Sequence, residues 1–341
     1  MNTVTSSSTS VAETSPRVSG RSTMMAAVID APRSMDLRSI ALPEPGPDQV
    51  RIRLEGCGVC ASNLPVWQGR PWFKYPVEAG APGHEAWGRI DAAGRDVRHL
   101  QPGDRVAALS YHAYAQYDLA SADSVAALPK ELDDAPFPAE PLACAVNAFR
   151  RAGVAADSKV AIVGVGFLGA LLTCLASRAK AEVIAISRRP FALAMARRCG
   201  AAHVIEMRDH QAIIDEVKGL TGGQGCDVVI EAVGAQWPLD LATELTAVRG
   251  RLVIAGYHQD GPRQVNMQTW NWKGLDVVNA HELDPRMNTE GMKQAIAMAA
   301  LGTFPLRDLL THSYSLDGLP RAMQDMEERP EGFLKGWIRY D

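Results

Sequence analysis

The sequence predicts an α/β protein of two domains, in which a mostly β domain is followed by a doubly wound α/β domain. First, a chain of 341 residues is too long for one compact core. Second, short β-like runs separated by turns fill the first half, whereas strand and helix patterns alternate in the second. Third, a glycine-rich turn, G-x-G-x-x-G, lies at the start of the alternating half.

The glycine-rich turn joins a short apolar run to a segment of helical length, after which a second strand-like run follows. Gly164 suits the tight turn, Gly166 lets the backbone approach a pyrophosphate, and Gly169 lets the helix pack closely on the strand. The helix N-terminus presents free N–H groups to the phosphates. The βαβ unit therefore predicts a dinucleotide site, whose residues in this turn are Gly164, Gly166, Phe167, Leu168 and Gly169.

Composition excludes several classes of partner. Apolar residues make up 47% of the chain and charged residues 22%, as in an ordinary soluble enzyme. A net charge of −4 gives no electrostatic reason to expect nucleic acid or an anionic membrane, and no apolar run approaches the ~20 residues that span a bilayer. The six scattered cysteines favour free or metal-bound thiols in the cytoplasm. Residues 1–22, rich in Ser and Thr, are expected to be a disordered extension.

Individual elements follow from apolar runs and turn residues. In the β half, the expected strands are 25–30, 49–54, 86–90, 105–109 and 113–119, which suggest an irregular barrel or sandwich. In the second half, the expected strands are 160–163, 183–186, 203–206, 227–231, 251–255 and 276–279. Helices are expected near 191–199, 210–219 and 238–249. Six strands in this alternation are typical of a doubly wound sheet.

Three loop segments of the β half carry metal-ligand chemistry. They contain Cys57-x-x-Cys60, the pair His84-Glu85, and Glu140 just before the dinucleotide unit. Thiolate, imidazole and carboxylate are the ligands of a catalytic zinc that keeps one position open. Each segment alone has another interpretation: the cysteines could be half of a zinc ribbon or a redox pair, His84 a hydrogen-bonded loop residue, and Glu140 a solvated residue at a helix start.

In this order, the three segments together resemble the medium-chain dehydrogenase/reductase superfamily of zinc-dependent alcohol and polyol dehydrogenases. The segment 58–63, GVCASN, is similar to the family's G-x-C-x-[ST]-D, and 83–85 is its G-H-E. The resemblance extends from about Met24 to Asp341 and includes the turn at 103–106. It also includes a helix expected at Leu316–Met326.

The resemblance implies a GroES-like catalytic domain and a Rossmann cofactor domain. The catalytic domain would comprise 23–146 and 285–341, so that the C-terminal segment returns to complete it, and the cofactor domain would comprise 147–284. The cysteine-rich lobe that holds a second, structural zinc in relatives has no counterpart after the turn at 103–106. One zinc per chain is therefore expected.

The resemblance also assigns roles to residues. Cys60 and His84 resemble the first two zinc ligands, and Glu140 occupies the third position, as in the polyol and threonine dehydrogenase branch. Glu85 is similar to the carboxylate that approaches or exchanges onto the metal. Ser62 corresponds to the hydroxyl that contacts the substrate oxygen and begins a proton relay.

Two residues depart from the family pattern, and one cysteine lies outside it. Asn63 replaces an aspartate that orients the ligand histidine, and its oxygen could still accept that hydrogen bond without the charge. Pro65 stands where many relatives carry the relay histidine, so a different proton exit is needed. Cys57 lies where the family varies and is expected to be structural.

The residues after the second strand of the βαβ unit predict the cofactor. An NAD enzyme usually places Asp or Glu there to bind the ribose 2′-hydroxyl, but this chain has Ser187, Arg188 and Arg189. A hydroxyl and two guanidinium groups suit the 2′-phosphate of NADP(H) instead, which we expect to be preferred over NAD(H). The alternative is two solvated arginines on a surface turn.

The expected function is a zinc-dependent hydride transfer between NADP(H) and an alcohol–carbonyl pair. Glu140 and the amide-rich segment 265–272, VNMQTWNW, favour a polyol, sugar or similarly polar substrate, although that segment could equally cover a dimer interface. Two rivals are a zinc-free reductase of the quinone-oxidoreductase type and a non-catalytic NADPH-binding protein. The presence of the candidate metal ligands argues against both.

The last strand of the α/β domain predicts an oligomer. Strand 276–279 would present an unpaired apolar edge, and proteins usually cover such edges. Relatives pair this strand across a two-fold axis. A homodimer or a homotetramer built from dimers is therefore expected.

Overall fold

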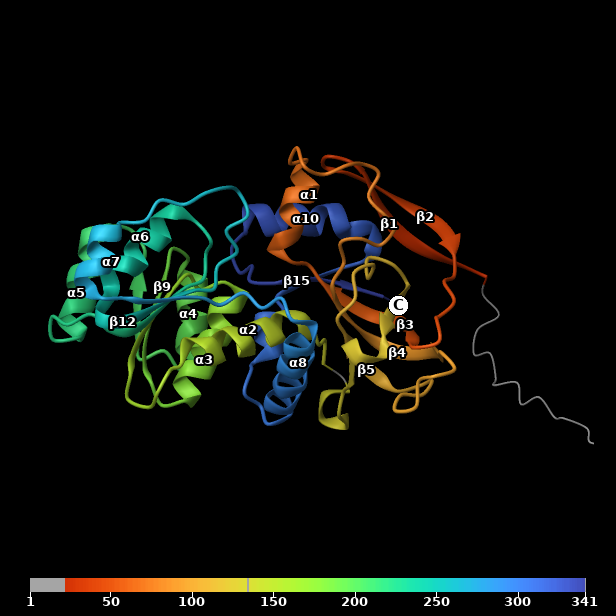
Figure 1. Cartoon of the computed structure of the whole chain (residues 1–341). Coiled ribbons are helices and arrows are strands. Elements are labelled where there is room, and N and C mark those ends of the chain that lie inside the picture. The colour runs from red at the N-terminus through yellow and green to blue at the C-terminus, as the bar shows by residue number, and fades with distance from the viewer. Residues whose placement is uncertain (1–21, 134, 341) are drawn as a thin grey trace, which may run out of the picture.

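The computed structural model describes residues 22–133 and 135–340, so nearly all of the expected extension at 1–22 lies outside the described residues. These residues form an α/β domain and a β-rich domain with helices α2 (Ala139–Ala152) and α8 (Pro285–Ala300) between them (Figure 1). The predicted fold class is confirmed. None of the described helices combines the length and the apolar character needed to cross a membrane.

The α/β domain, which is the expected cofactor domain, is built on six parallel strands in the order β10-β9-β8-β11-β12-β13. The strands are β8 (Lys159–Val163), β9 (Glu182–Ser187), β10 (His203–Glu206), β11 (Cys226–Glu231), β12 (Thr246–Ile254) and β13 (Asp276–Asn279). Around them lie α3 (Phe167–Arg178), α4 (Pro190–Arg198), α5 (His210–Leu220), α6 (Gln236–Leu245) and α7 (Met267–Lys273). The strand order reverses between β8 and β11, and ligands of such sheets bind there, at the carboxyl ends of the strands.

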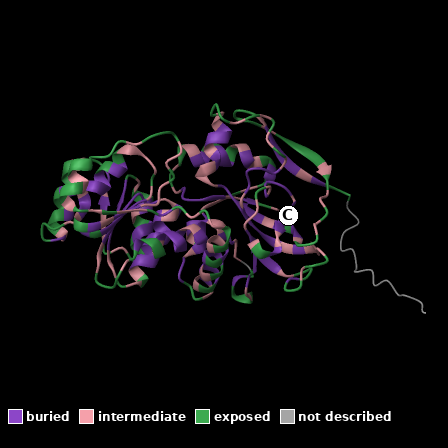
Figure 2. Ribbon diagram, viewed as in Figure 1, coloured by how far each residue is buried: buried purple, intermediate pink, exposed green. Residues whose placement is uncertain are grey.

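The apolar runs of the central strands explain this sheet. Val160–Val163 in β8 and Val183–Ile186 in β9 are completely buried, because helices cover both faces (Figure 2). Parallel sheets require such continuous apolar runs rather than alternation. The sequence expectation for these strands is therefore confirmed for a physical reason, since each run could be satisfied only in a doubly covered sheet.

The β-rich domain, which is the expected catalytic domain, contains a seven-stranded sheet with the order β14-β15-β3-β4-β5-β7 and β6 paired to β3, beside a hairpin of β1 and β2. Its strands are β1 (Thr23–Ala31), β2 (Ser34–Ala41), β3 (Gln49–Gly58), β4 (Glu85–Ala93), β5 (Arg105–Ala108), β6 (Tyr117–Ser121), β7 (Val125–Ala127), β14 (His312–Tyr314) and β15 (Gly336–Arg339). Its other helices are α1 (Leu64–Gln68), α9 (Leu306–Leu309) and α10 (Leu319–Glu328). Strand β15 pairs with β3, so the C-terminal segment does return to this domain.

The two domains share a packed core. A cluster of buried residues runs from Trp87 in β4 through Leu142 in α2 and Leu171 in α3 to Ile296 in α8. Helix α2 passes the expected boundary at 146/147 without a break. The metal-ligand loops of one domain and the glycine turn of the other are therefore held in a defined relation.

Two expected elements have different limits. The strand expected at 113–119 begins only at Tyr117, because Ala113 and Tyr114 bond to the loop at 80–83 and to β1 instead of joining the ladder. The helix expected at 238–249 ends at Leu245, after which β12 begins. Within β12, Arg249 has a φ of 59°, which is incompatible with a continuing right-handed helix.

The segment 265–272 forms most of α7 and lies at the outer end of the cofactor domain (Figure 1). Trp270 donates from its indole nitrogen to Thr243 Oγ1 at 3.1 Å, whereas Trp272 is 83% exposed. This position, remote from the catalytic domain of the same chain, argues against the interpretation as a substrate pocket. The dimer interpretation stays a prediction.

Candidate active site at the domain junction

Three possible metal ligands lie close together near the end of β3 and the beginning of β4. The ligand atoms of Cys60, His84 and Glu85 all lie within 4.8 Å of one another. The register pairs Gly58 with Glu85, which brings the loop after β3 beside the start of β4. A Cβ atom on Gly58 would lie 1.7 Å from Glu85 Oε2, so only glycine leaves room for this carboxylate. The local sequence is thus shaped around the three donors.

His84 presents one ring nitrogen to this cluster. Its Nδ1 donates to the carbonyl oxygen of Pro82 at 2.7 Å, so Nε2 faces the cluster and lies 3.5 Å from Ser62 Oγ. Burial disfavours the charged ring, but the hydrogen bond and charge of Cys60, with the nearby carboxylates, raise the pKa of His84 to about 10. The cluster therefore attracts positive charge, as a cation site should.

Glu85 supplies the observation that tests whether a metal fits. Its side chain is completely buried; Oε1 accepts from Lys335 Nζ at 2.5 Å, whereas Oε2 has no hydrogen-bond partner among the described residues. An unpaired buried carboxylate oxygen is costly unless a proton or a cation satisfies it. With a thiol and an imidazole beside it, the donor set suits zinc.

Lys335 connects the donor cluster to the cofactor domain. It lies just before β15, is buried, and holds its ammonium 5.3 Å from the centre of the Phe167 ring in the glycine turn. Burial alone would lower its pKa, but the charges of Glu85, Cys60 and Glu140 outweigh burial and raise it. Sequence reasoning missed this residue, whose local signal was only a lysine within the apolar run before the last strand.

Glu140 lies close to the cluster but does not complete it. It is in the first turn of α2, and its Oε1 accepts from Cys144 Sγ at 3.1 Å. Its charge acts on His84 and Lys335, yet its oxygens are not within the group of three donors. Its role as third ligand stays a prediction.

Cys57, the other cysteine of the C-x-x-C motif, is fully buried and donates from Sγ to the carbonyl oxygen of Gly58 at 3.4 Å. Burial raises the pKa of its thiol well above the usual value. It is not one of the three clustered donors, which agrees with the structural role expected for it.

The prediction that the ligand histidine donates a hydrogen bond to Asn63 is wrong. The Asn63 amide donates to the Tyr114 hydroxyl at 2.6 Å, and its Oδ1 lies 3.5 Å from Ser62 Oγ. His84 uses the Pro82 carbonyl instead. Asn63 therefore positions Ser62 rather than His84.

The glycine turn has the geometry that a dinucleotide requires. Gly164 has a φ of 101°, which favours glycine, and a Cβ on Gly169 would lie 2.0 Å from the Gly164 carbonyl oxygen. A Cβ on Gly166 would meet nothing within 4 Å, so its backbone borders open space at the N-terminus of α3. The geometry at each of the three positions thus agrees with the reason for which the sequence predicts glycine there. The open backbone at Gly166 is where a pyrophosphate would fit.

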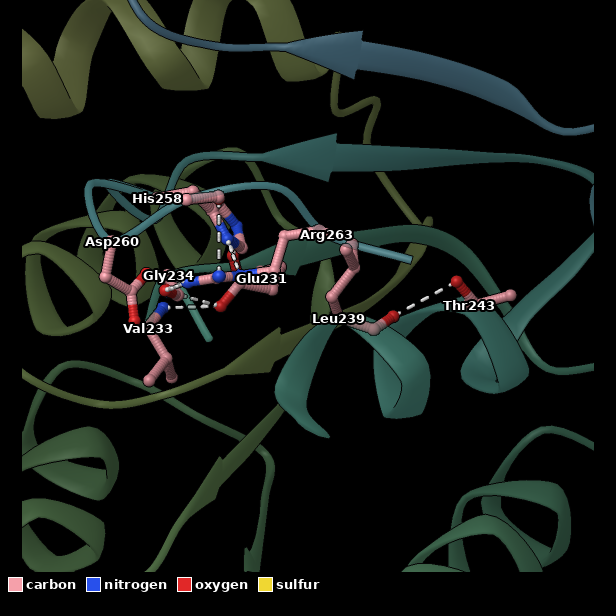
Figure 3. A network of polar contacts seen from close by, with 9 residues as sticks. Glu231, Val233, Gly234, Leu239, Thr243, His258, Asp260 and Arg263 are labelled. Carbon is pink, nitrogen blue, oxygen red and sulfur yellow. Dashed lines mark hydrogen bonds and ion pairs between the residues drawn. The ribbon is translucent and has the colours of Figure 1, made fainter. Parts of the chain in front are cut away.

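A buried polar network supports this turn from the neighbouring strand (Figure 3). Glu231, completely buried at the end of β11, accepts from the backbone N–H groups of Val233 and Gly234 at 2.7 and 2.8 Å. Arg263 Nε donates to His258 Nδ1 at 2.9 Å, so His258 Nε2 carries a proton and donates to Glu231 at 3.1 Å. The network holds the Val233 turn against Gly164, and sequence reasoning did not find it.

The residues at and after the end of β9 lie in different environments. Ser187 is buried at the end of the strand, Arg188 is exposed, and Glu182 lies at the opposite end of the strand, paired with Lys159. Arg189 is hydrogen-bonded within the protein, and its expected role as a stacking or second contact to the cofactor stays a prediction. Its guanidinium donates to the carbonyl oxygens of Phe333 and Val165, and therefore ties the C-terminal segment to the glycine turn.

Known families match both domains. A sequence family described as the alcohol dehydrogenase GroES-like domain matches residues 46–130, and a family described as zinc-binding dehydrogenase matches residues 167–300. The chain belongs to the zinc-dependent medium-chain dehydrogenase/reductase superfamily. The first match includes Cys60, His84 and Glu85, and the second begins at Phe167, directly inside the glycine turn.

Individual relatives of this dehydrogenase cover nearly the whole chain. Sorbitol dehydrogenase of Ovis aries is 28% identical, over 92% of this chain and 96% of that protein. Erythritol/L-threitol dehydrogenase of Mycolicibacterium smegmatis is also 28% identical, over 88% of this chain and 93% of that protein.

Solved structures share the fold. A putative zinc-binding dehydrogenase from Sinorhizobium meliloti bound to NADP superposes with a TM-score of 0.80 at 25% identity, over 94% of this chain and all of that one. 2R,3R-butanediol dehydrogenase from Bacillus subtilis gives a TM-score of 0.82 at 22% identity, over 93% of this chain and 100% of its own, which supports the fold alone.

Proposed function

We propose that this oxidoreductase of the alcohol dehydrogenase type uses zinc and NADP(H) to transfer a hydride between the cofactor and an alcohol–carbonyl pair, with a polyol or similarly polar substrate. The observation that carries the proposal is the cluster of Cys60, His84 and buried Glu85. Among the described residues, Glu85 Oε2 has no hydrogen-bond partner. This cluster is joined through Lys335 to the Phe167 ring of the dinucleotide turn. This proximity supports a metal centre beside the dinucleotide turn.

The residues have distinct tasks in this scheme. Cys60 and His84 would hold the zinc, with Glu140 as third ligand and Glu85 able to approach it. When bound, zinc would polarise the substrate oxygen and stabilise the alkoxide. Ser62, whose hydroxyl lies 3.5 Å from both His84 Nε2 and Asn63 Oδ1, would accept the hydroxyl proton of the substrate while passing its own proton on to solvent. Buried Lys335 would hold Glu85 in its orientation through the contact with Oε1.

The substrate class rests on the relatives and on Glu140. Two relatives at 28% identity are named for polyols, sorbitol and erythritol or L-threitol. The branch that places glutamate at the third ligand position is the polyol and threonine dehydrogenase branch. Because α7 lies at the outer end of the cofactor domain, its amides do not support a polar substrate. A polyol substrate is therefore supported by family branch and not by a defined pocket.

The preference for NADP(H) rests on the end of β9. Ser187 and Arg188 stand where a carboxylate would bind the 2′-hydroxyl of NAD(H). The solved relative at 25% identity contains NADP, which agrees with this assignment.

Metal analysis combined with a substrate screen tests the proposal. The purified protein should contain about one zinc per chain and should oxidise at least one polyol with NADP⁺, faster than simple aliphatic alcohols. Absence of zinc after careful reconstitution, together with reduction of quinones or C=C bonds, would establish the zinc-free reductase. Absence of any turnover with bound NADPH would indicate the non-catalytic alternative.

A homodimer or homotetramer is also proposed, and light scattering checks it. Strand β13 is the last strand of the cofactor sheet, with one side paired to β12, and nearby Trp272 is 83% exposed. Pairing of β13 with a second copy would cover this edge. At micromolar concentration we expect at least twice the chain mass of 36.8 kDa. A monomeric mass would contradict the prediction.

The six free cysteines, four of them buried, suit a reducing compartment, and on that basis we propose a cytoplasmic location.

A further inference from the structure

Three arginines from the two domains lie within electrostatic range of one another near the end of β9. Arg188 and Arg189 follow β9 in the cofactor domain, whereas Arg329 follows α10 in the catalytic domain. Burial, followed by the charges of Arg329 and Arg188, lowers the pKa of Arg189 to about 10. Within residues 22–133 and 135–340, no carboxylate oxygen lies within 4.0 Å of these three guanidinium groups. The cluster thus has positive charge without a counter-ion from the described part of the chain.

The backbone that carries Arg329 is held in place from both sides. Arg329 has a φ of 51° and donates from its backbone nitrogen to Asp325 at 2.8 Å, which ends α10. The Phe333 nitrogen donates to the Pro330 carbonyl at 3.0 Å and closes the next turn. Arg189 then bonds to the Phe333 carbonyl. Arg189 is therefore a positioning residue that brings the catalytic-domain turn to the cofactor domain.

We propose that Arg329, together with Arg188, binds the 2′-phosphate of NADP(H), so that this phosphate lies between the two domains. The inference rests on the proposed NADP(H) preference and adds a residue from the other domain. A phosphate dianion forms charge-assisted hydrogen bonds with guanidinium groups and would relieve their mutual repulsion. NAD(H) lacks this group, so it would miss the connection between the domains.

The proposal is tested by calorimetric binding of 2′,5′-ADP and 5′-AMP, which differ only in the 2′-phosphate. The native protein should bind 2′,5′-ADP more tightly. Arg329→Asn should weaken binding of 2′,5′-ADP by about tenfold and leave 5′-AMP unchanged. Asparagine is chosen because it tolerates the left-handed backbone. Arg329→Lys, which keeps the charge, should restore most of the difference.

Arg249 provides a matched control. It is also an exposed arginine with a left-handed backbone, at a φ of 59°, but it lies near the start of β12, at the end of the sheet opposite to the cofactor edge. Arg249→Asn should change neither affinity. Comparing Arg329→Asn with Arg249→Asn therefore separates loss of a specific charge from the general effect of replacing an arginine that has a left-handed backbone.

The outcomes distinguish this inference from the proposed function. If the native protein discriminates between the two ligands and Arg329→Asn discriminates equally well, Arg329 is excluded and the NADP(H) preference stands. Equal weakening of both ligands in Arg329→Asn would show a structural role and would also overturn the inference. If the native protein binds both ligands equally, the NADP(H) preference and the inference fail together.

Discussion

Replacing Cys60 or His84 by alanine is expected to abolish zinc retention and to lower turnover by at least about a thousandfold, since zinc supplies several kcal/mol of charge stabilisation. Each substitution removes one of the three clustered donors. Binding of NADPH should remain close to native, because the glycine turn belongs to the other domain. Metal content by mass spectrometry and NADPH titration by fluorescence measure the two effects separately.

Cys57→Ala is the matched control for the thiol. Cys57 lies three residues before Cys60, but its Sγ bonds to a backbone carbonyl and lies outside the donor cluster. The variant should keep its zinc and lose some stability through weaker packing. Equal loss of zinc in Cys57→Ala and Cys60→Ala would show that the wrong cysteine has been assigned.

Glu140→Ala extends the same experiment to the third zinc ligand, for which Glu140 and Glu85 are the two candidate carboxylates. Because the Glu140 oxygens lie outside the group of three, its loss should weaken zinc binding less than loss of the Cys60 thiolate. Glu85→Gln provides the comparison. If Glu85→Gln loses zinc and Glu140→Ala does not, the third ligand is Glu85.

Features with a local signal could be predicted from the sequence. The apolar run at 160–163 and the glycines after it describe a strand and a turn without reference to any distant residue. The structure accordingly constrains two of these glycines as expected, through the φ of 101° at Gly164 and the 2.0 Å approach at Gly169. Cys60 and His84 could likewise be found because each lies in a short motif whose loop positions are fixed by β3 and β4.

Features that depend on distant partners could not be predicted. Lys335 contacts Glu85 across 250 residues of sequence, and the sequence around either residue does not indicate the other as its partner. The sequence predicts that Asn63 accepts a hydrogen bond from His84, but the Pro82 carbonyl, which is nearer in the chain, accepts it instead. The Asn63 amide donates its own hydrogen bond to the Tyr114 hydroxyl. Competition among several acceptors is decided by tertiary placement.

The same reason explains the segment 265–272. Its tryptophans and amides were compatible with either a pocket or an interface, because both environments favour such residues. Only the tertiary position of α7, with Trp270 bonded to Thr243 in α6, shows that the segment belongs to the outer surface of the cofactor domain.

The double substitution Ser187→Asp/Arg188→Ala is expected to invert the cofactor preference, with the ratio of kcat/KM for NADPH over NADH falling by about a hundredfold or more. Two effects combine. A carboxylate at 187 would repel the 2′-phosphate and accept a hydrogen bond from the ribose 2′-hydroxyl, and loss of Arg188 would remove a guanidinium from the phosphate. Each effect is on the order of 1.4 kcal/mol or more, and 1.4 kcal/mol corresponds to tenfold.

The single variants make this test specific. Arg188→Ala alone should weaken NADPH use without improving NADH use, whereas Ser187→Asp should do both, because only a carboxylate gives the NADH ribose a new partner. Ser187 is buried at the end of β9 beside β10, so unfolding temperatures must accompany the kinetics to separate misfolding from altered selectivity. A native preference for NADH, or an unchanged ratio in the double variant, would remove Ser187 and Arg188 from the 2′-phosphate site.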